Sequence, residues 1–173
     1  RRRKPVLVYT DASFTRWHGG VGMIGIVIID LEDPSIIHVA GRVVPGHILA
    51  RFRPRKTYIG QLEALAAVMA YTSRPDLFQD REVVHFIDNT GALYGLHHGY
   101  SGDQDTSYII HAYYALSLAL GFRTWWAYVP SAANIADYPS RLKWQETTDA
   151  IRAEFPNSTI SYFTDDLVWP SAE

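Results

Sequence analysis

The chain has 173 residues, of which 47% are hydrophobic and 20% are charged. This length and composition fit one globular domain and exclude an intrinsically disordered chain. The sequence contains no cysteine, which excludes a disulfide framework and a thiolate-bound zinc site. No apolar run reaches the roughly 18 residues needed to span a bilayer, so we expect an intracellular protein, in the cytoplasm or the nucleus.

The net charge of −2 is unevenly distributed along the chain. Residues 1–56 contain ten Lys and Arg and four Asp and Glu, whereas residues 57–173 contain six and fourteen. Basic residues gather at the start of the chain and again around Phe52, where guanidinium groups flank an aromatic ring. Such a cluster either binds phosphates or forms a solvated loop, and charge alone does not decide between them. The second cluster, called the basic cluster below, consists of Arg51, Arg53, Arg55 and Lys56.

The first part of the chain is predicted to form three β-strands. Apolar and β-branched runs cover residues 5–14, 23–29 and 36–44, and they are separated by Gly-rich residues 19–22 and by turn-forming residues 33–35. Consecutive strands with short turns form an antiparallel meander. The first strand begins directly after the basic tetrapeptide, which leaves open that the chain is a piece of a longer protein.

The rest of the chain alternates helices with strands. The density of Ala, Leu and Met in residues 57–73 predicts a helix that is packed on one face. This order predicts an α/β fold: a five-stranded mixed sheet, with three antiparallel strands followed by two parallel strands, and helices on both faces. We expect this domain to cover residues 1–155 and a tail of unknown role to follow at 156–173. The remaining predicted elements are a strand at 83–87, helices at 89–98 and 103–120, a strand at 122–129, and a segment at 132–155 that is broken or helical around Pro139.

Four carboxylates occupy positions beside or within apolar segments: Asp11, Glu63, Asp88 and Asp137. A carboxylate at the end of a buried strand is held by rigid backbone on one side and faces solvent on the other. Several such groups that converge form an all-oxygen site, which suits Mg²⁺. For any one acid taken singly, a helix cap or a surface charge is the simpler interpretation.

The chain resembles the ribonuclease H domain of reverse transcriptases over residues 5–145. Residues 9–13 (YTDAS), 61–65 (QLEAL) and 87–89 (IDN) are similar to the first-strand, first-helix and fourth-strand motifs of that family. Residues 129–141 (VPSAANIADYPSR) are similar to its closing segment. The closing segment is the most specific, and it is similar to versions in tyrosine-recombinase retroelements and hepadnaviral polymerases rather than to cellular ribonucleases H.

This resemblance implies a ribonuclease H-like fold and a metal-dependent endonuclease that hydrolyses the RNA strand of RNA–DNA hybrids. It implies that Asp11, Glu63, Asp88 and Asp137 are the catalytic residues and the ligands of two Mg²⁺ ions, for which Mn²⁺ can substitute. The partners it implies are an RNA–DNA hybrid and the polymerase domain of a reverse transcriptase, in the same or a larger polypeptide. No membrane partner is expected.

Polar residues beside the four acids are candidate contacts for the sugars or phosphates of the hybrid. Asn89 is equally well placed to cap the helix that follows it, and Arg141 to pair with a nearby acid. Trp17 and Phe14, near the turn after Asp11, are further candidates for contact with a partner or substrate. The candidate nucleic-acid contacts are Ser13, Gln61, Asn89, Asn134 and Arg141, together with the basic cluster.

The sequence departs from the family pattern in one place. Many active ribonucleases H carry a histidine in the loop before the last carboxylate, where it assists proton transfer or product release. Residues 130–136 contain no histidine. The alternative interpretation is therefore a catalytically weak or inactive ribonuclease H-like module that binds protein or RNA in a larger assembly.

Overall fold

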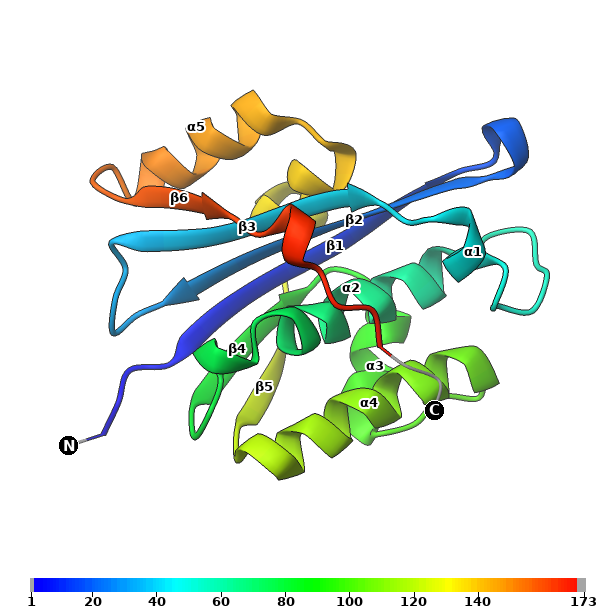
Figure 1. The fold of residues 1–173 in the computed structure, drawn as a ribbon, viewed down its shortest axis with the longest axis horizontal. Helices are drawn as coiled ribbons and strands as arrows, with labels where there is room; N and C mark the ends of the chain where they lie inside the picture. The colour runs from blue at the N-terminus through cyan, green and yellow to red at the C-terminus, as the bar shows by residue number, and fades with distance from the viewer. Residues whose placement is uncertain (1, 171–173) are drawn as a thin grey trace.

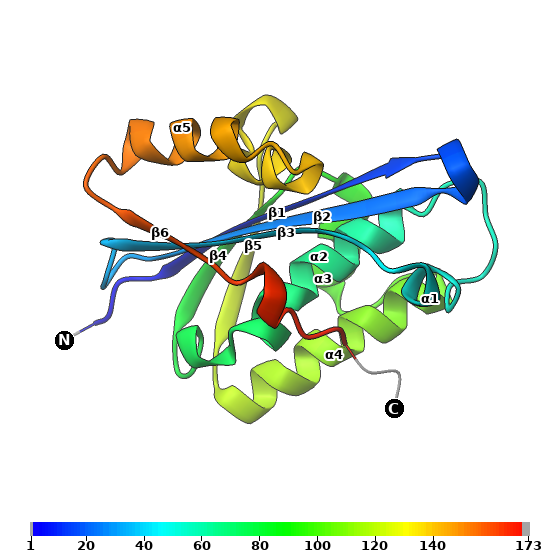
Figure 2. The ribbon, with the colours of Figure 1, turned by 45° about the horizontal axis from the view of Figure 1, so that its top comes forward.

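In the computed structural model, which describes residues 2–170, a single mixed sheet of six strands lies between two layers of helices (Figures 1 and 2). The strand order is β5-β4-β1-β2-β3-β6. The pairs β1–β2 and β2–β3 are antiparallel, and the pairs β1–β4, β4–β5 and β3–β6 are parallel. The strands are β1 (Val6–Thr15), β2 (Val21–Asp30), β3 (Ile36–Val43), β4 (Glu82–Ile87), β5 (Arg123–Tyr128) and β6 (Thr159–Tyr162).

Helices α2, α3 and α4 cover one face of the sheet, and α5 covers part of the other (Figures 1 and 2). The helices are α1 (Gly46–Leu49), α2 (Ile59–Ser73), α3 (Thr90–His98), α4 (Gln104–Leu120) and α5 (Trp144–Glu154). Short 3-10 turns connect these elements: η1 (Trp17–Gly19), η2 (Pro75–Leu77), η3 (Ser131–Ala133), η4 (Ile135–Asp137), η5 (Pro139–Arg141) and η6 (Thr164–Asp166). No helix among the described residues is both long and apolar enough to cross a membrane.

The predicted antiparallel meander and the predicted order of strands and helices are confirmed. Helix α2 is more deeply enclosed than predicted, because every residue from Leu62 to Tyr71 is buried. The helix lies between the sheet and α4, so neighbours cover it on both sides. The predicted cap of α3 is also confirmed, since the side chain of Asn89 accepts a hydrogen bond from the backbone N–H of Ala92 at 2.9 Å.

The prediction of five strands is wrong by one strand. Strand β6 adds in parallel to β3, and the pairing is framed by hydrogen bonds from Thr159 N to Ser35 O (2.7 Å) and from Phe163 N to Val39 O (2.9 Å). With four residues, β6 is too short to show a clear hydrophobic period, so only its pairing partner reveals it.

After β6 the chain crosses to the face of the sheet that α2, α3 and α4 cover, and runs beside α2 (Figure 1). The backbone N–H of Val168 donates to Ser73 Oγ at 2.9 Å, and its carbonyl accepts from Thr72 Oγ1 at 2.6 Å. The last part of the predicted tail, residues 171–173, lies outside the described residues, as does Arg1.

Candidate active site

Strands β1 and β4 run parallel for a short distance and then part, and this fork creates the site. Their pairing begins at Val6 with Val83 and ends at Tyr9 with Phe86. In the sheet, β2 lies beside β1 on one side of this pair and β5 lies beside β4 on the other. The chain therefore continues in opposite directions across the sheet after β1 and after β4, and the fork is the point at which strand order reverses. In open α/β sheets, ligands bind in the crevice at the carboxyl ends of strands at such a point.

Three carboxylates meet at this fork. Asp11 continues β1 past its last pairing with β4, Asp88 follows β4 directly, and Glu63 comes from α2. Each offers an oxygen within 4.8 Å of the others. The backbone N–H of Ala12 donates to Asp11 Oδ1 at 2.9 Å and to Glu63 Oε1 at 3.3 Å, which fixes these two side chains relative to each other.

The fourth predicted acid reaches the fork from the α5 side of the sheet. Asp137 lies at the end of η4 and lines, with the other three acids, one open cleft of about 480 Å³. Its carboxyl contributes to the raised pKa of Asp11, and Arg141 Nε donates to Asp137 Oδ1 at 3.1 Å. The structure therefore brings the four predicted acids together.

Two glycines allow the η4–η5 segment to lie directly on the sheet. Gly25 of β2 and Gly41 of β3 are in register with Asp11. A Cβ atom would lie 2.3 Å from Ser140 N at the first glycine and 2.3 Å from Pro139 O at the second. Sequence reasoning missed this pair, although a glycine inside an apolar strand is a recognised sign of close backbone approach.

Ser140, which is fully buried, joins the η4–η5 segment to β1. Its Oγ donates to the carbonyl of Asp137 at 2.7 Å and lies 3.5 Å from Asp11 Oδ2. Its carbonyl accepts from Ser13 Oγ at 2.9 Å. The hydroxyl of Ser13 thus has an internal partner, and its contact with a substrate stays a prediction.

Asn134 connects the segment that precedes Asp137 to β1 and to the end of β4. Its Nδ2 donates to Thr10 O at 3.0 Å and to Asp88 Oδ2 at 3.3 Å, while its Oδ1 accepts from Ala136 N at 3.1 Å. The amide is buried, and these bonds use its donors and its acceptor inside the protein. Its position orients Asp88, and its contact with a substrate stays a prediction.

The carboxylates are held in an environment that opposes their charge. Asp11 and Glu63 are only 5% and 3% exposed. Burial, and then the neighbouring acids, raise the pKa of Glu63 far above its ordinary value. Burial also raises the pKa of Asp11, to which Asp88 and Asp137 add, although its hydrogen bond with Glu63 lowers it. Without a cation, the pair therefore retains a proton at pH values where carboxyls are ordinarily ionised.

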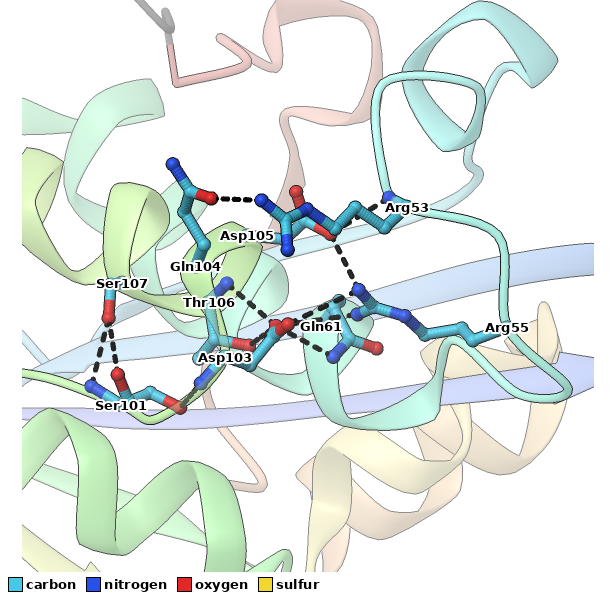
Figure 3. Close-up of polar contacts among 9 residues, drawn as sticks. All are labelled: Arg53, Arg55, Gln61, Ser101, Asp103, Gln104, Asp105, Thr106 and Ser107. Carbon is cyan, nitrogen blue, oxygen red and sulfur yellow. Dashed lines mark hydrogen bonds and ion pairs between the residues drawn. The ribbon is translucent and has the colours of Figure 1, made fainter.

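Two members of the basic cluster, Arg53 and Arg55, bond to residues at the start of α4. Arg55 forms ion pairs with Asp103 (3.2 Å) and Asp105 (2.7 Å) at the start of α4 (Figure 3). The guanidinium of Arg53 donates to Gln104 Oε1, and its backbone N–H donates to Asp105 Oδ2 at 2.9 Å (Figure 3). The other two members, Arg51 and Lys56, are exposed.

Gln61 takes part in the same network instead of facing the four acids. Its Nε2 donates to Asp103 Oδ2 at 2.9 Å, beside the hydrogen bonds from Thr106 N and Oγ1 that cap α4 (Figure 3). Burial alone would raise the pKa of Asp103, but the hydrogen bonds from Thr106 and Gln61 and the charge of Arg55 outweigh it and hold the pKa at about 2. The ionised carboxylate thus joins the starts of α2 and α4.

A buried polar chain, which sequence reasoning did not find, connects the elements that carry the acids. Thr10 Oγ1 of β1 lies 2.7 Å from His85 Nε2 of β4, and Tyr71 OH of α2 lies 2.8 Å from His85 Nδ1. Tyr71 OH also lies 3.1 Å from Thr124 Oγ1 of β5. Burial lowers the pKa of His85 to about 3, so the imidazole is neutral near pH 7. These hydrogen bonds connect β1, β4, α2 and β5 in the core.

The fold is similar to those of solved ribonucleases H. Ribonuclease H1 from Halobacterium salinarum NRC-1 has 19% identity, with 83% of this chain and 99% of that chain covered and a TM-score of 0.61. The N-terminal ribonuclease H domain of Rv2228c from Mycobacterium tuberculosis has 15% identity, with 84% and 97% covered and a TM-score of 0.62. LC9-RNase H1 has 14% identity, with 97% and 90% covered and a TM-score of 0.55.

These similarities show that the chain has a ribonuclease H-like fold. No protein-family model matches the sequence, and no curated protein sequence matches it. A shared fold does not fix the chemistry of a site, which depends on the residues that form it.

Proposed function

We propose that this protein is a metal-dependent endoribonuclease that hydrolyses the RNA strand of RNA–DNA hybrids, as the ribonuclease H domain of a retroelement reverse transcriptase. The observation that carries this proposal is the meeting of three carboxylates, two of them buried, whose oxygens lie within 4.8 Å of one another at the fork of β1 and β4. Carboxylates this close together repel one another and lower the stability of the fold unless a cation binds between them.

The residues fit a divalent cation. Glu63 Oε2 is buried, and it has no hydrogen-bond partner among the described residues. A buried oxygen in this state is costly, and a cation would satisfy it. An all-carboxylate donor set suits Mg²⁺, or Mn²⁺ in its place, and the ligands would be Asp11, Glu63, Asp88 and Asp137. Two such ions, when bound, supply activation of a water and neutralisation of the charge that develops on the leaving oxygen.

The chain itself supplies geometry and further charge. The backbone N–H of Ala12 sets the distance between Asp11 and Glu63, and Asn134 orients Asp88. Arg141 and Lys143 line the same cleft and are exposed, so they are suitably placed to bind phosphates beside the scissile bond. No side-chain nucleophile is needed, because hydrolysis uses water.

Two features support the finer parts of this proposal. The solved structures that share this fold are named as ribonucleases H, which supports a hybrid as the substrate. The closing segment at 129–141 is similar to versions in retroelement polymerases, which supports a polymerase domain as partner, in the same or a larger polypeptide. We accordingly expect the protein to act in the cytoplasm or the nucleus.

A second candidate is a catalytically weak or inactive module that binds protein or RNA. The observation that favours it is the composition of the cleft: among the described residues that line it, none is a histidine. His85 does not serve in its place, because it is fully buried and bonded to Thr10 and Tyr71 in the core.

A cleavage assay separates the two candidates. The labelled RNA strand is annealed to DNA or to RNA, and each duplex is incubated with Mg²⁺, with Mn²⁺ or with a chelator. We expect cleavage of the RNA strand in the hybrid only when a divalent cation is present. Asp88→Asn should abolish it, whereas the matched control Asp149→Asn, an exposed site on α5, should not. Tight binding of the hybrid without cleavage in either cation would establish the second candidate.

A further inference from the structure

The β1–β2 hairpin extends the floor of the cleft beyond the four acids. Alternate residues of a strand share one face, so Asp11, Ser13 and Thr15 follow one another on the same face of β1. On β2, Met23 is in register with Ser13, and Val21 with Thr15. Thr15 and Met23 line the cleft, and the hairpin then projects past the end of α5 (Figures 1 and 2). A continuous surface thus leads from the acids to the hairpin tip.

The tip of this hairpin is held in a defined conformation. The backbone N–H of Gly20 donates to Trp17 O at 3.1 Å, and Gly20 has a φ of 97°, which favours glycine. A Cβ atom at Gly20 would lie 2.9 Å from Phe14 Cζ, so the aromatic ring packs directly against the turn. The ring of Phe14 in turn contacts that of Tyr58 edge to face, with centroids 5.5 Å apart. These contacts fix the turn relative to the cleft.

The tip exposes a large aromatic side chain next to a cationic one. Trp17 is 79% exposed, although tryptophan side chains are usually mostly buried. Arg16, its neighbour, is exposed as well. Across the cleft, Arg141 and Lys143 are also exposed. Cationic groups on both sides and an apolar ring suit a polyanion that presents sugar rings between its phosphates.

We propose that the hairpin tip is a second contact with the hybrid duplex, in which Trp17 packs against sugar rings and Arg16 binds a backbone phosphate. This inference rests on the function proposed for the cleft. It goes further by inferring how many base pairs of hybrid the protein contacts. Trp17 follows Asp11 by six residues, which is roughly 20 Å along an extended strand. At roughly 3.4 Å per base pair, the tip contacts the duplex about six base pairs from the scissile phosphate.

Binding measurements with two hybrid lengths test this contact. One hybrid has about 8 base pairs, closed by a loop, and is too short to span cleft and tip from a central cut site; the other has about 20. The variants are Trp17→Ala, Trp17→Phe and the matched control Trp125→Ala, which removes another exposed tryptophan (61%) from the edge strand β5. Fluorescence anisotropy with Ca²⁺ in place of Mg²⁺ reports affinity, and steady-state cleavage in Mg²⁺ reports KM and kcat.

We expect Trp17→Ala to weaken binding of the long hybrid about 5- to 20-fold and of the short hybrid less than about 2-fold. In cleavage of the long hybrid, KM should rise while kcat is retained. Trp17→Phe should restore most of the affinity, and Trp125→Ala should change neither hybrid.

Unchanged affinity of Trp17→Ala for the long hybrid would overturn the proposal, and so would an equal loss on both lengths. If the wild-type protein binds the hybrid without cleaving it, the proposed function fails. The length-dependent loss then still decides whether the hairpin tip contacts nucleic acid.

Discussion

Charged groups are buried at both ends of the β1–β4 pair. At one end a buried charge is paired within the chain, and at the other end several acids lie together without a cationic partner among them. At the amino end, Arg81 is 4% exposed and forms two hydrogen bonds with Asp30, of 2.9 and 2.7 Å. At the carboxyl end, Asp11, Glu63 and Asp88 share one sign of charge within 4.8 Å.

At the amino end the charge of Arg81 is paired within the chain, although its Nε has no partner among the described residues, and the ion pair joins strand β2 to the segment that enters β4. The carboxyl end needs charge from outside, because burial and mutual repulsion raise the pKa of both Asp11 and Glu63. A buried charge that the chain pairs internally holds the fold together, whereas buried charges left in excess indicate a binding site. The same kind of substitution should therefore have opposite effects on stability at the two ends.

The largest effect is expected from Asp88→Asn, which keeps the shape of the side chain and removes its charge. Cleavage of the hybrid should fall by at least about 1,000-fold, because the variant removes one of the four proposed metal ligands. The midpoint of thermal unfolding without divalent cation should stay the same or rise, since repulsion among the acids decreases. Initial cleavage rates and thermal melts measure the two results, and unchanged cleavage would show that Asp88 is not a ligand.

At the opposite end, Arg81→Leu should lower the free energy of unfolding by about 3 kcal/mol, because it leaves the charge of Asp30 unpaired. Urea denaturation measures this loss. Arg152→Leu, at an exposed position on α5, is the matched control and should change stability by less than about 0.5 kcal/mol. A loss no larger than that of the control would mean that the ion pair does not stabilise the fold.

Glu63→Gln should raise the free energy of unfolding by about 1–2 kcal/mol at pH 7 without divalent cation. The pKa of Glu63 is raised on folding, so its contribution is most favourable below its ordinary value of 4.5 and is lost as the pH rises above it. The gain in the variant should therefore be small at pH 4.5 and larger at pH 7. Burial lowers the pKa of His85, which destabilises the fold as the pH falls below 6.5, but subtracting the two stability curves cancels that contribution.

With Mg²⁺ present, the wild type should become more stable than Glu63→Gln. A cation that binds only the folded state stabilises the wild type and not the variant, which lacks one of the ligands. Urea unfolding with and without Mg²⁺ checks this reversal. If Glu63→Gln is destabilising at pH 7 without a cation, burial and repulsion among the four acids do not destabilise the fold.

The smallest effect is expected in the basic cluster, where paired and exposed charges occur side by side. Exchange of Arg51 and Lys56 for Gln should leave stability unchanged and lower the salt slope of log K for the hybrid by roughly 0.7–0.9 for each lost phosphate contact. Exchange of Arg53 and Arg55 for Gln should lower stability by up to about 1 kcal/mol, because it removes the bonds to the start of α4.

Titrations at several salt concentrations, with unfolding curves for each double variant, separate the two pairs. Neither pair should alter the turnover rate at saturating hybrid. If the salt slope of the Arg51 and Lys56 double variant equals that of the wild type, this part of the loop does not bind phosphates.

Much of the fold was readable from the sequence, because hydrophobic periodicity and capping are local. The apolar runs that end near Asp11 and Asp88, and the cap at Asn89, are visible within windows of about ten residues. The positions of the predicted strands and helices therefore agree with those in the structure to within a few residues. Motif resemblance also brought Glu63 and Asp137 into the candidate site, and all four acids line one cleft.

Tertiary structure alone decided which side chains meet. Gln61 lies two residues before Glu63, yet it bonds to Asp103, far along the chain. Gly25 is required by the close approach of the Ser140 backbone, and the imidazole of His85 is bonded to partners on two other elements, β1 and α2. Likewise, β6 is a strand only because β3 lies beside it. Local patterns determine which elements form, but pairing and contact depend on groups that are distant in sequence, and no short window contains both partners.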